Sequence, residues 1–277
     1  MSVIKSLRRG LSYIIHGVPN VEVRPEIFVS SPTNTLYNKK IIVTGGGSGL
    51  GFAMAKKFSS EGAKVLITGR NITTLAKAAQ EIGCDFRKLD ITSPEFFDNF
   101  IADAASILGG IDCLVNNAGV SLHESSLFEV TVETFDKQIN TNFRGPYFLS
   151  QSFAKYLFNN HKEGNILFIS SETGETMDIR PYGFSKAAIN SMVKGLAYLF
   201  KKDGIRVNAI APGITASEMT GIDGKGNLYA GSYGSGRFYL PAEVAEVACF
   251  FLSDFSKSVS GQIITCNNAQ TINARWK

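Results

Sequence analysis

Tyr182 and Lys186 are the residues of this chain whose types and spacing most directly indicate chemistry. They stand four positions apart at the predicted start of a helix, so their side chains lie on one face, one turn from each other. A phenol keeps its proton up to pH ~10, and a neighbouring ammonium group favours the phenolate and lowers that pKa. The pair predicts an acid/base tyrosine that works near neutral pH, although this spacing also occurs by chance in ordinary helices.

A glycine-rich segment far upstream predicts a phosphate-binding site. The β-branched run Lys40–Val43 is followed by Thr-Gly-Gly-Gly-Ser-Gly-Leu-Gly at positions 44–51, and then by apolar residues at helical spacing. This order of strand, turn and helix places backbone N–H groups and a helix N-terminus against a phosphate. Gly45 permits the tight turn, Gly49 lets the backbone approach a pyrophosphate, and Gly51 lets the helix pack closely on the strand. We therefore expect a dinucleotide site.

The end of the next predicted strand, Val65–Thr68, indicates which dinucleotide is bound. A carboxylate at that point binds the ribose 2′-hydroxyl of NAD, whereas a nearby arginine accommodates a 2′-phosphate. The chain has Gly69 at the acidic position and Arg70 directly after it. This favours NADP(H) over NAD(H); the alternative is a surface arginine that caps the strand.

From about Leu36 to about Cys266 the chain resembles the classical short-chain dehydrogenase/reductase family, and in particular its NADP-dependent 3-oxoacyl-reductase-like and sugar or polyol oxidoreductase members. Seven motifs occur in the family's order. They are the segments Thr44–Gly51, Leu89–Ile91, Asn116–Gly119, Asn142, Gly164–Ser171, the pair Tyr182 and Lys186, and Arg206–Gly213.

The resemblance implies a role for each of four residues. Tyr182 would act as general acid in carbonyl reduction and as base in the reverse direction, while Lys186 would lower its pKa and hold the nicotinamide ribose. Ser171 would hydrogen-bond the substrate oxygen, and Asn142 would hold a water that links Lys186 to solvent. Ser171 and Asn142 could instead only satisfy backbone groups. The implied cofactor-binding residues are Thr44, Gly45, Ser48, Gly49, Leu50, Gly51, Arg70, Asp90, Ile91, Asn117, Ala118, Gly119, Tyr182, Lys186, Pro212, Gly213 and Ser217.

The chain departs from the family pattern at three places. Ser171 and Tyr182 are eleven residues apart, about two fewer than is common, so the intervening loop must take a tighter path and bring Glu175, Asp178 and Arg180 to the substrate entrance. That polarity indicates a hydrophilic substrate, unless the loop is merely exposed and charged. Ser217 stands where the family usually has a threonine, and the segment 266–270 replaces an acidic residue and a double glycine.

Alternating short apolar runs and helical patterns predict one α/β domain over 36–277. We expect a Rossmann-type, doubly wound parallel sheet of about seven strands with helices on both faces. The expected strands are Ile41–Thr44, Val65–Thr68, Phe86–Leu89, Cys113–Asn116, Asn165–Ser170, Arg206–Ala211 and Gln262–Thr265. The expected helices are Leu50–Glu61, Ile72–Glu81, Pro94–Leu108, Val132–Asn159, Tyr182–Lys202 and Pro241–Ser253.

Two segments lie outside this common framework. The first, at about 214–240, is rich in glycine and aromatic residues and is expected to form a mobile substrate lid, with a disordered loop as the alternative. The second is the N-terminal extension 1–35, where Ile4, Leu7 and Leu11 recur at helical spacing beside Arg8 and Arg9. It is expected to be an arm that packs on a neighbouring subunit or a basic amphipathic helix in peripheral contact with a membrane. It has no continuous apolar core typical of a cleaved signal peptide.

Composition limits the partners of the protein. The 277 residues are 44% hydrophobic and 19% charged, with a formal net charge of +4 spread along the chain, which gives no nucleic-acid footprint. No stretch reaches the ~20 apolar residues of a transmembrane helix, and the three histidines have no metal-site spacing. Four widely separated cysteines are typical of reduced thiols in a cytoplasmic protein.

Two long central helices indicate self-association. Apolar residues expected to be exposed on them are Phe148, Phe153, Tyr156, Leu157 and Leu199. Because such helices pair between subunits in the family, we expect a homodimer or homotetramer; the alternative is a monomer that buries this face internally.

Together these observations predict an NAD(P)-dependent oxidoreductase that interconverts a carbonyl and an alcohol on a small, polar molecule. Fatty-acyl and steroid ketones stay open as substrates. One alternative is a non-catalytic protein of the same fold that senses a cofactor or serves a structural role. The other is an epimerase or dehydratase that uses the same Tyr–Lys pair.

Overall fold

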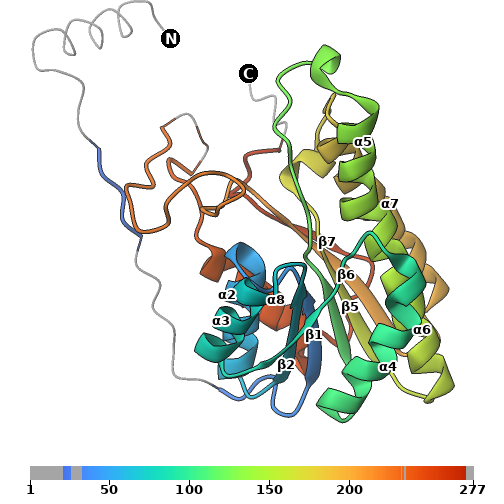
Figure 1. Ribbon diagram of the computed structural model, residues 1–277. Coiled ribbons are helices and arrows are strands. Elements are labelled where there is room, and N and C mark those ends of the chain that lie inside the picture. The colour runs from blue at the N-terminus through green and yellow to red at the C-terminus, as the bar shows by residue number, and fades with distance from the viewer. Residues whose placement is uncertain (1–20, 26–32, 232, 234, 273–277) are drawn as a thin grey trace, which may run out of the picture.

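The computed structural model describes residues 21–25, 33–231, 233 and 235–272 (Figure 1). The helix expected near the start of the N-terminal extension lies outside the described residues. In the part of the chain that is described, no helix has the length and hydrophobicity needed to cross a membrane.

Seven parallel strands form one sheet in the order β3-β2-β1-β4-β5-β6-β7. The strands are β1 (Lys40–Thr44), β2 (Lys64–Gly69), β3 (Asp85–Lys88), β4 (Cys113–Asn116), β5 (Gly164–Ile169), β6 (Ile205–Pro212) and β7 (Ile263–Cys266). Central β1 pairs with β2 on one side and β4 on the other, so that Val43 lies opposite both Ile67 and Val115. These β-branched side chains are buried, as strands covered on both faces require. The predicted doubly wound fold is confirmed.

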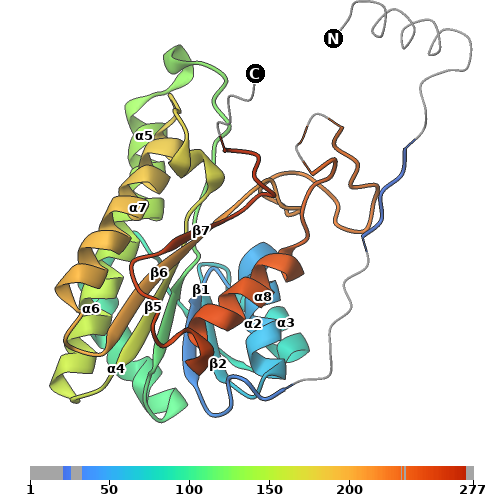
Figure 2. The same cartoon turned by 180° about the vertical axis from the view of Figure 1, so that it is seen from behind.

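Helices cover both faces of this sheet (Figures 1 and 2). On one face α2 (Gly49–Ser60), α3 (Ile72–Ile82) and α8 (Pro241–Leu252) bury Met54, Phe58, Leu75 and Phe251. On the other, α4 (Phe97–Leu108), α6 (Gly145–Asn159) and α7 (Pro181–Leu199) bury a second cluster around Phe97 and Val193. Most expected element bounds agree with the observed ones to within three residues.

Two expectations about the central helices were wrong. Phe153 and Leu157 are not exposed but fully buried in the second cluster, because they lie on the α6 face that packs on the sheet. The helix expected over Val132–Asn159 is interrupted: α5 (Val132–Ile139) leads into a π-helical turn at Asn140–Arg144 before α6 begins. Such turns often mark functional sites in helices.

The cause of the interruption can be read from the residues around it. Pro146 has no N–H, so it cannot donate the α-helical hydrogen bond that the carbonyl of Asn142 would otherwise accept. A side chain at Gly145 would lie 2.0 Å from the carbonyl oxygen of Ile91, so the chain must pass that point without a Cβ. Asn142 is thereby placed where the helix geometry changes.

The segment 214–240, expected to be a lid, rises from the carboxyl edge of the sheet and lies beside the N-terminal residues 21–25 (Figures 1 and 2). The Val23 amide donates to Asn227 Oδ1 over 2.9 Å, and the Leu228 amide donates to the Val23 carbonyl over 3.0 Å. Asn227 Nδ2 donates in turn to the Val21 carbonyl. Residues 21–25 of the extension thus contact the segment 214–240 of their own chain.

Candidate active site

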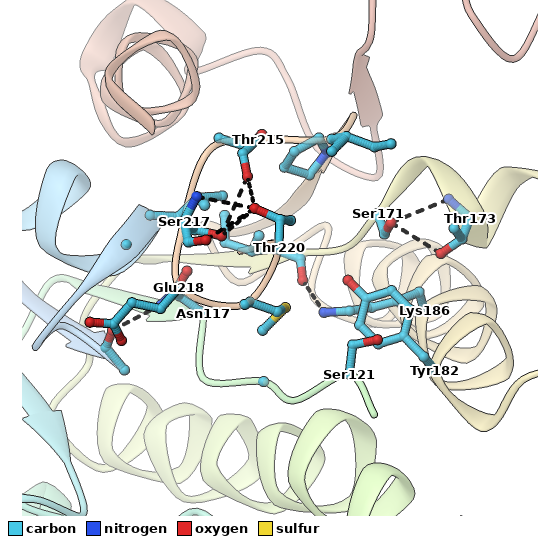
Figure 3. A pocket seen from close by; sticks show the side chains of 18 of the residues that line it. Asn117, Ser121, Ser171, Thr173, Tyr182, Lys186, Thr215, Ser217, Glu218 and Thr220 are labelled. Atoms are coloured by element: carbon cyan, nitrogen blue, oxygen red, sulfur yellow. Dashed lines mark hydrogen bonds between the residues drawn. The ribbon is translucent and has the colours of Figure 1, made fainter. Parts of the chain in front are cut away.

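A cleft of about 950 Å³ opens at the carboxyl edge of the sheet. The strand order reverses there, between β1 and β4, which is the place where doubly wound sheets bind ligands. Its lining comes from the loop after β1, the ends of β4, β5 and β6, the start of α7 and the segment 214–222. Figure 3 shows Tyr182 and Lys186 close together, with Ser217 and Thr220 on another side of the pocket.

The glycine loop has the geometry of a phosphate cradle. Gly45 and Gly49 adopt φ of 65° and 55°, values that other residues rarely take. A Cβ on Gly51 would lie 2.2 Å from the Gly45 carbonyl oxygen, so the loop and α2 can approach only without one. Ser48, at the N-cap of α2, makes no side-chain cap and no acidic residue occupies the first turn. The positive end of α2 therefore carries no side-chain cap, and because Ser48, Gly49 and Leu50 line the cleft, the site fits a pyrophosphate.

Thr44 joins the loop after β1 to the loop after β4. Its hydroxyl donates to the Val115 carbonyl and accepts from the amides of Asn117 (2.9 Å) and Ala118 (3.0 Å). Asn117 Nδ2 returns hydrogen bonds to the carbonyls of Thr44 and Gly45. Thr44 is buried, whereas Gly45, Asn117, Ala118 and Gly119 line the cleft.

Arg70 lies at the end of the cleft next to a second pocket of about 690 Å³, which Ser48, Asn71 and Thr74 also line. Asp90 does not line either pocket. Its carboxylate accepts hydrogen bonds from the Thr92 amide and hydroxyl, which lower its pKa, and the charge of Arg70 acts in the same direction.

Ile91 also lies outside the lining and is buried against Gly145. The expected cofactor residues Ser48, Gly49, Leu50, Pro212, Gly213 and Ser217 all line the larger cleft.

Ser171, Tyr182 and Lys186 meet in this cleft. Lys186 is 4% exposed, and its Nζ donates to the Ile169 carbonyl over 2.8 Å and lies 5.4 Å from the centre of the Tyr182 ring. Burial lowers the pKa of Lys186 to about 8. Ser171 Oγ accepts hydrogen bonds from the amide and hydroxyl of Thr173, at the start of the 3-10 turn Glu172–Glu175.

The expected lowering of the Tyr182 pKa is not found. Burial raises the pKa of Tyr182, and a hydrogen bond from Ser171 only partly opposes that shift. The reason is that the phenolate would be desolvated, while Lys186 is itself held in a setting that disfavours its charge. In this state Tyr182 carries its proton at neutral pH.

Asn142 lies beneath the cleft and does not line it. Only 1% of it is exposed, and its side chain is bonded to Val120 and Ser185: Oδ1 accepts from the Val120 amide, while Nδ2 donates to the Val120 carbonyl and to Ser185 Oγ. A Cβ on Gly119 would lie 3.4 Å from Asn142 Oδ1 and 3.8 Å from Lys186 Nζ. Asn142 and Lys186 thus approach the same glycine from two elements.

The short connection between Ser171 and Tyr182 packs tightly on α7 through two glycines. A Cβ on Gly174 would lie 2.9 Å from the Lys186 backbone, and one on Gly183 would lie 2.4 Å from Asp178. Arg180 lines the cleft and forms a two-pronged ion pair with Asp178, at 2.8 and 2.6 Å.

Glu175 was expected at the entrance but is turned away, because its carboxylate accepts a hydrogen bond from Asn190. Instead, Glu172, Ser121 and His123 line the cleft, although their sequence pattern did not single them out. For Glu172 the available signal was its position directly after Ser171. His123 adopts φ of 57°, and its Nε2 lies 2.8 Å from the Met219 carbonyl, which joins the loop after β4 to the lid segment.

A doubly wound parallel sheet with a glycine cradle at its switch point, and a Ser, Tyr and Lys group in the same cleft, defines a dinucleotide-dependent oxidoreductase of the Rossmann type. A family model described as enoyl-(acyl carrier protein) reductase matches residues 45–268. The chain belongs to the short-chain dehydrogenase/reductase family, whose members act on CH–OH groups with NAD(P).

Characterised relatives show the range of this family. The galactitol 2-dehydrogenase of Agrobacterium fabrum is 31% identical over 82% of this chain and 95% of its own length. The 3alpha-hydroxysteroid dehydrogenase of Mediterraneibacter gnavus is 31% identical over 84% of this chain and 97% of its own. The crystal structure of 3-ketoacyl-(acyl-carrier-protein) reductase from Brucella melitensis complexed with NADH has a TM-score of 0.79 at 28% identity, covering 86% of this chain and all (100%) of that one.

Proposed function

We propose that the protein is an NADP(H)-dependent oxidoreductase that interconverts a carbonyl and an alcohol, with Tyr182 as the acid/base. The observation that carries the proposal is the meeting of Ser171, Tyr182 and Lys186 in one cleft with the glycine cradle. A bound nicotinamide cofactor would supply or accept the hydride. The protein then has to orient the substrate and move one proton.

The hydrogen bonds around Ser171 support its role in holding the substrate oxygen. Its hydroxyl oxygen accepts from both polar groups of Thr173, so its own proton is available either to Tyr182, as in this structure, or to a substrate oxygen. A carbonyl oxygen that accepts from Ser171 also lies near Tyr182, whose raised pKa makes it a proton donor in the reductive direction.

Lys186 and Asn142 would resupply the proton. The pKa of Lys186 near 8 lets it exchange a proton close to neutral pH. The carbonyl of Asn142, which Pro146 cannot satisfy, is an acceptor suited to hold a water. Lys186 would also hold the ribose through its remaining donors, since one is used by the Ile169 carbonyl.

Arg70 supports the choice of NADP(H). It projects from the end of β2 into a pocket with Asn71 and Thr74, and the preceding Gly69 offers no carboxylate to a ribose 2′-hydroxyl. A guanidinium is the side chain best suited to a phosphate monoester.

A sugar or polyol is the proposed substrate. The part of the cleft around Tyr182 has polar walls, with Ser121, Glu172, Thr173 and Arg180 among the lining residues. The similarity to a galactitol dehydrogenase agrees with this choice, and the similarity to a hydroxysteroid dehydrogenase supplies the competing class for the test.

We also propose that the protein assembles as a homodimer or homotetramer in the cytoplasm. Tyr147, Phe158 and Leu199 on α6 and α7 are 42%, 45% and 64% exposed and offer an apolar surface for pairing. Light scattering across a concentration series would reveal a monomer if the proposal is wrong.

Replacing Tyr182 with Phe tests the mechanism. The variant keeps the ring and the packing but loses the proton, so kcat should fall by about 10²- to 10⁴-fold while NADPH affinity changes little. Tyr198→Phe is the matched control, because Tyr198 lies on the same helix and is 72% exposed. Initial rates would be measured with polyols, sugars, steroid ketones and 3-oxoacyl esters. Full turnover by Tyr182→Phe would remove Tyr182 from the mechanism.

A further inference from the structure

Glu172 brings a carboxylate into the cleft next to the group that is proposed to hold the substrate oxygen. It directly follows Ser171 and begins the 3-10 turn Glu172–Glu175. The other carboxylate among the described lining residues, Glu218, is exposed and also lines the pocket of Arg70, on the cofactor side. Glu172 is therefore the acidic group on the substrate side.

Neutral donors fix this carboxylate from two sides. Oε1 accepts a short hydrogen bond from the Tyr233 hydroxyl, and Oε2 accepts from Asn267 Nδ2 over 2.9 Å. Tyr233 in turn accepts from the Ile214 amide over 3.0 Å, and Asn267, which is 2% exposed, also donates to Thr271. The side chain is thus held in one orientation by the lid segment and by the residue after β7.

The negative charge of Glu172 is not neutralised by a cation. Within the described ranges no Lys or Arg forms an ion pair with it, and the nearby Arg180 is engaged by both oxygens of Asp178. A carboxylate offers about four acceptor sites, of which the two neutral donors fill one on each oxygen. Acceptor sites therefore remain for a ligand in the cleft.

We propose that Glu172 is a specificity-determining residue that accepts hydroxyl groups of the substrate close to the reacting carbon, and so selects polyhydroxylated substrates. This inference rests on the proposed function. A polyol replaces the water around the carboxylate with its own donors. An apolar alcohol displaces that water and leaves the remaining acceptor sites of the carboxylate without donors, which is unfavourable. Sites that hydrogen-bond a substrate hydroxyl discriminate strongly against molecules that lack it.

The contact with Tyr233 also ties Glu172 to the segment 214–240, so the experiment has to separate substrate selection from a latch on that segment. Glu172→Gln removes the charge but can still accept from Tyr233. Tyr233→Phe removes the latch but leaves the carboxylate in the cleft. Glu175→Gln is the matched control, because Glu175 lies in the same turn and contacts Asn190 outside the cleft.

The assay measures kcat/KM with NADP⁺ for galactitol, sorbitol and xylitol against cyclohexanol and 2-octanol. For Glu172→Gln we expect polyol kcat/KM to fall about 10- to 100-fold, as for loss of a hydrogen bond to a charged group, with no fall for the apolar alcohols. Tyr233→Phe and Glu175→Gln should keep the wild-type ratio between the two classes. NADPH titration of each variant reports whether it is folded.

Three results would overturn the inference: equal losses for both substrate classes, the same change of ratio in Tyr233→Phe, or a wild type that oxidises only the apolar alcohols. The third result would leave the proposed carbonyl–alcohol reaction intact. If the wild type oxidises no compound with either cofactor, the proposed function fails instead. In that case calorimetry with galactitol tests the role of Glu172 separately from the reaction. The inference requires that galactitol binding weaken at least about tenfold in Glu172→Gln.

Discussion

Arg70 offers the sharpest test of cofactor choice, because removing it should affect one dinucleotide and not the other. Arg70→Met keeps most of the aliphatic stem and removes the guanidinium. Hydrogen bonds to charged groups contribute about 1.5–3 kcal/mol. Arg70 is exposed at the mouth of its pocket, so solvent screening places it at the lower end, at about 1–2 kcal/mol. NADPH affinity should therefore weaken about 5- to 30-fold, with NADH affinity unchanged.

The measurement is a fluorescence titration of both reduced cofactors at low and high salt. The difference in NADPH affinity between wild type and variant should shrink at high salt. Dissolved ions screen the attraction between exposed charges, with a Debye length of about 10 Å at 0.1 M that shortens as salt is added. Arg87→Met serves as control: Arg87 is an exposed arginine on neighbouring β3, paired with Asp103 and outside both pockets. Equal losses for NADPH and NADH in Arg70→Met, or tighter NADH binding by the wild type, would refute the reasoning.

Two further predictions concern the cradle and the buried lysine. Gly51→Ala places a methyl group 2.2 Å from the Gly45 carbonyl oxygen, so it should cost about 1–3 kcal/mol in urea unfolding and weaken both cofactors. By contrast, Gly195→Ala on α7 meets nothing within 4 Å and should stabilise by up to about 1 kcal/mol; equal effects of the two changes would contradict the packing argument. Burial lowers the pKa of Lys186 from 10.5 to about 8, so the folded protein binds fewer protons than the unfolded chain between those values and gains stability as pH rises. Relative to Lys186→Met, the wild type should therefore gain about 2 kcal/mol between about pH 7 and 9.5, and parallel stability curves would rule out the lowered pKa.

The sequence identified the cofactor cradle because its determinants are local. Positions 44–51 combine a strand end, glycines at turn positions and a helix start within eight residues, and the backbone has few ways to follow that pattern. The same holds for the five inner strands β2, β1, β4, β5 and β6, whose apolar runs are buried. Tyr182 and Lys186 were also predictable as a pair, since their spacing on one helix fixes their relation.

Other features depended on contacts between distant segments. The π-helical turn before α6 lies where Gly145 meets the Ile91 carbonyl, a neighbour 54 positions away, and the local Pro146 alone does not reveal that contact. Glu175 had the sequence position of an entrance residue, yet Asn190 of α7 holds it outside the cleft, while Glu172 is held inside by Tyr233 and Asn267. Which of the two carboxylates lines the cleft is decided by those partners.

The pKa of Tyr182 shows most clearly which properties follow from the sequence and which depend on the tertiary structure. By itself the sequence determined that a phenol and an amine share one helix face, together with the phosphate loop and the alternation of strands and helices along the chain. Only the tertiary structure decided their electrostatic state: burial raises the pKa of Tyr182 and lowers that of Lys186. Spacing along a chain sets which groups can meet, whereas desolvation depends on everything packed around them, and that is a property of the assembled fold.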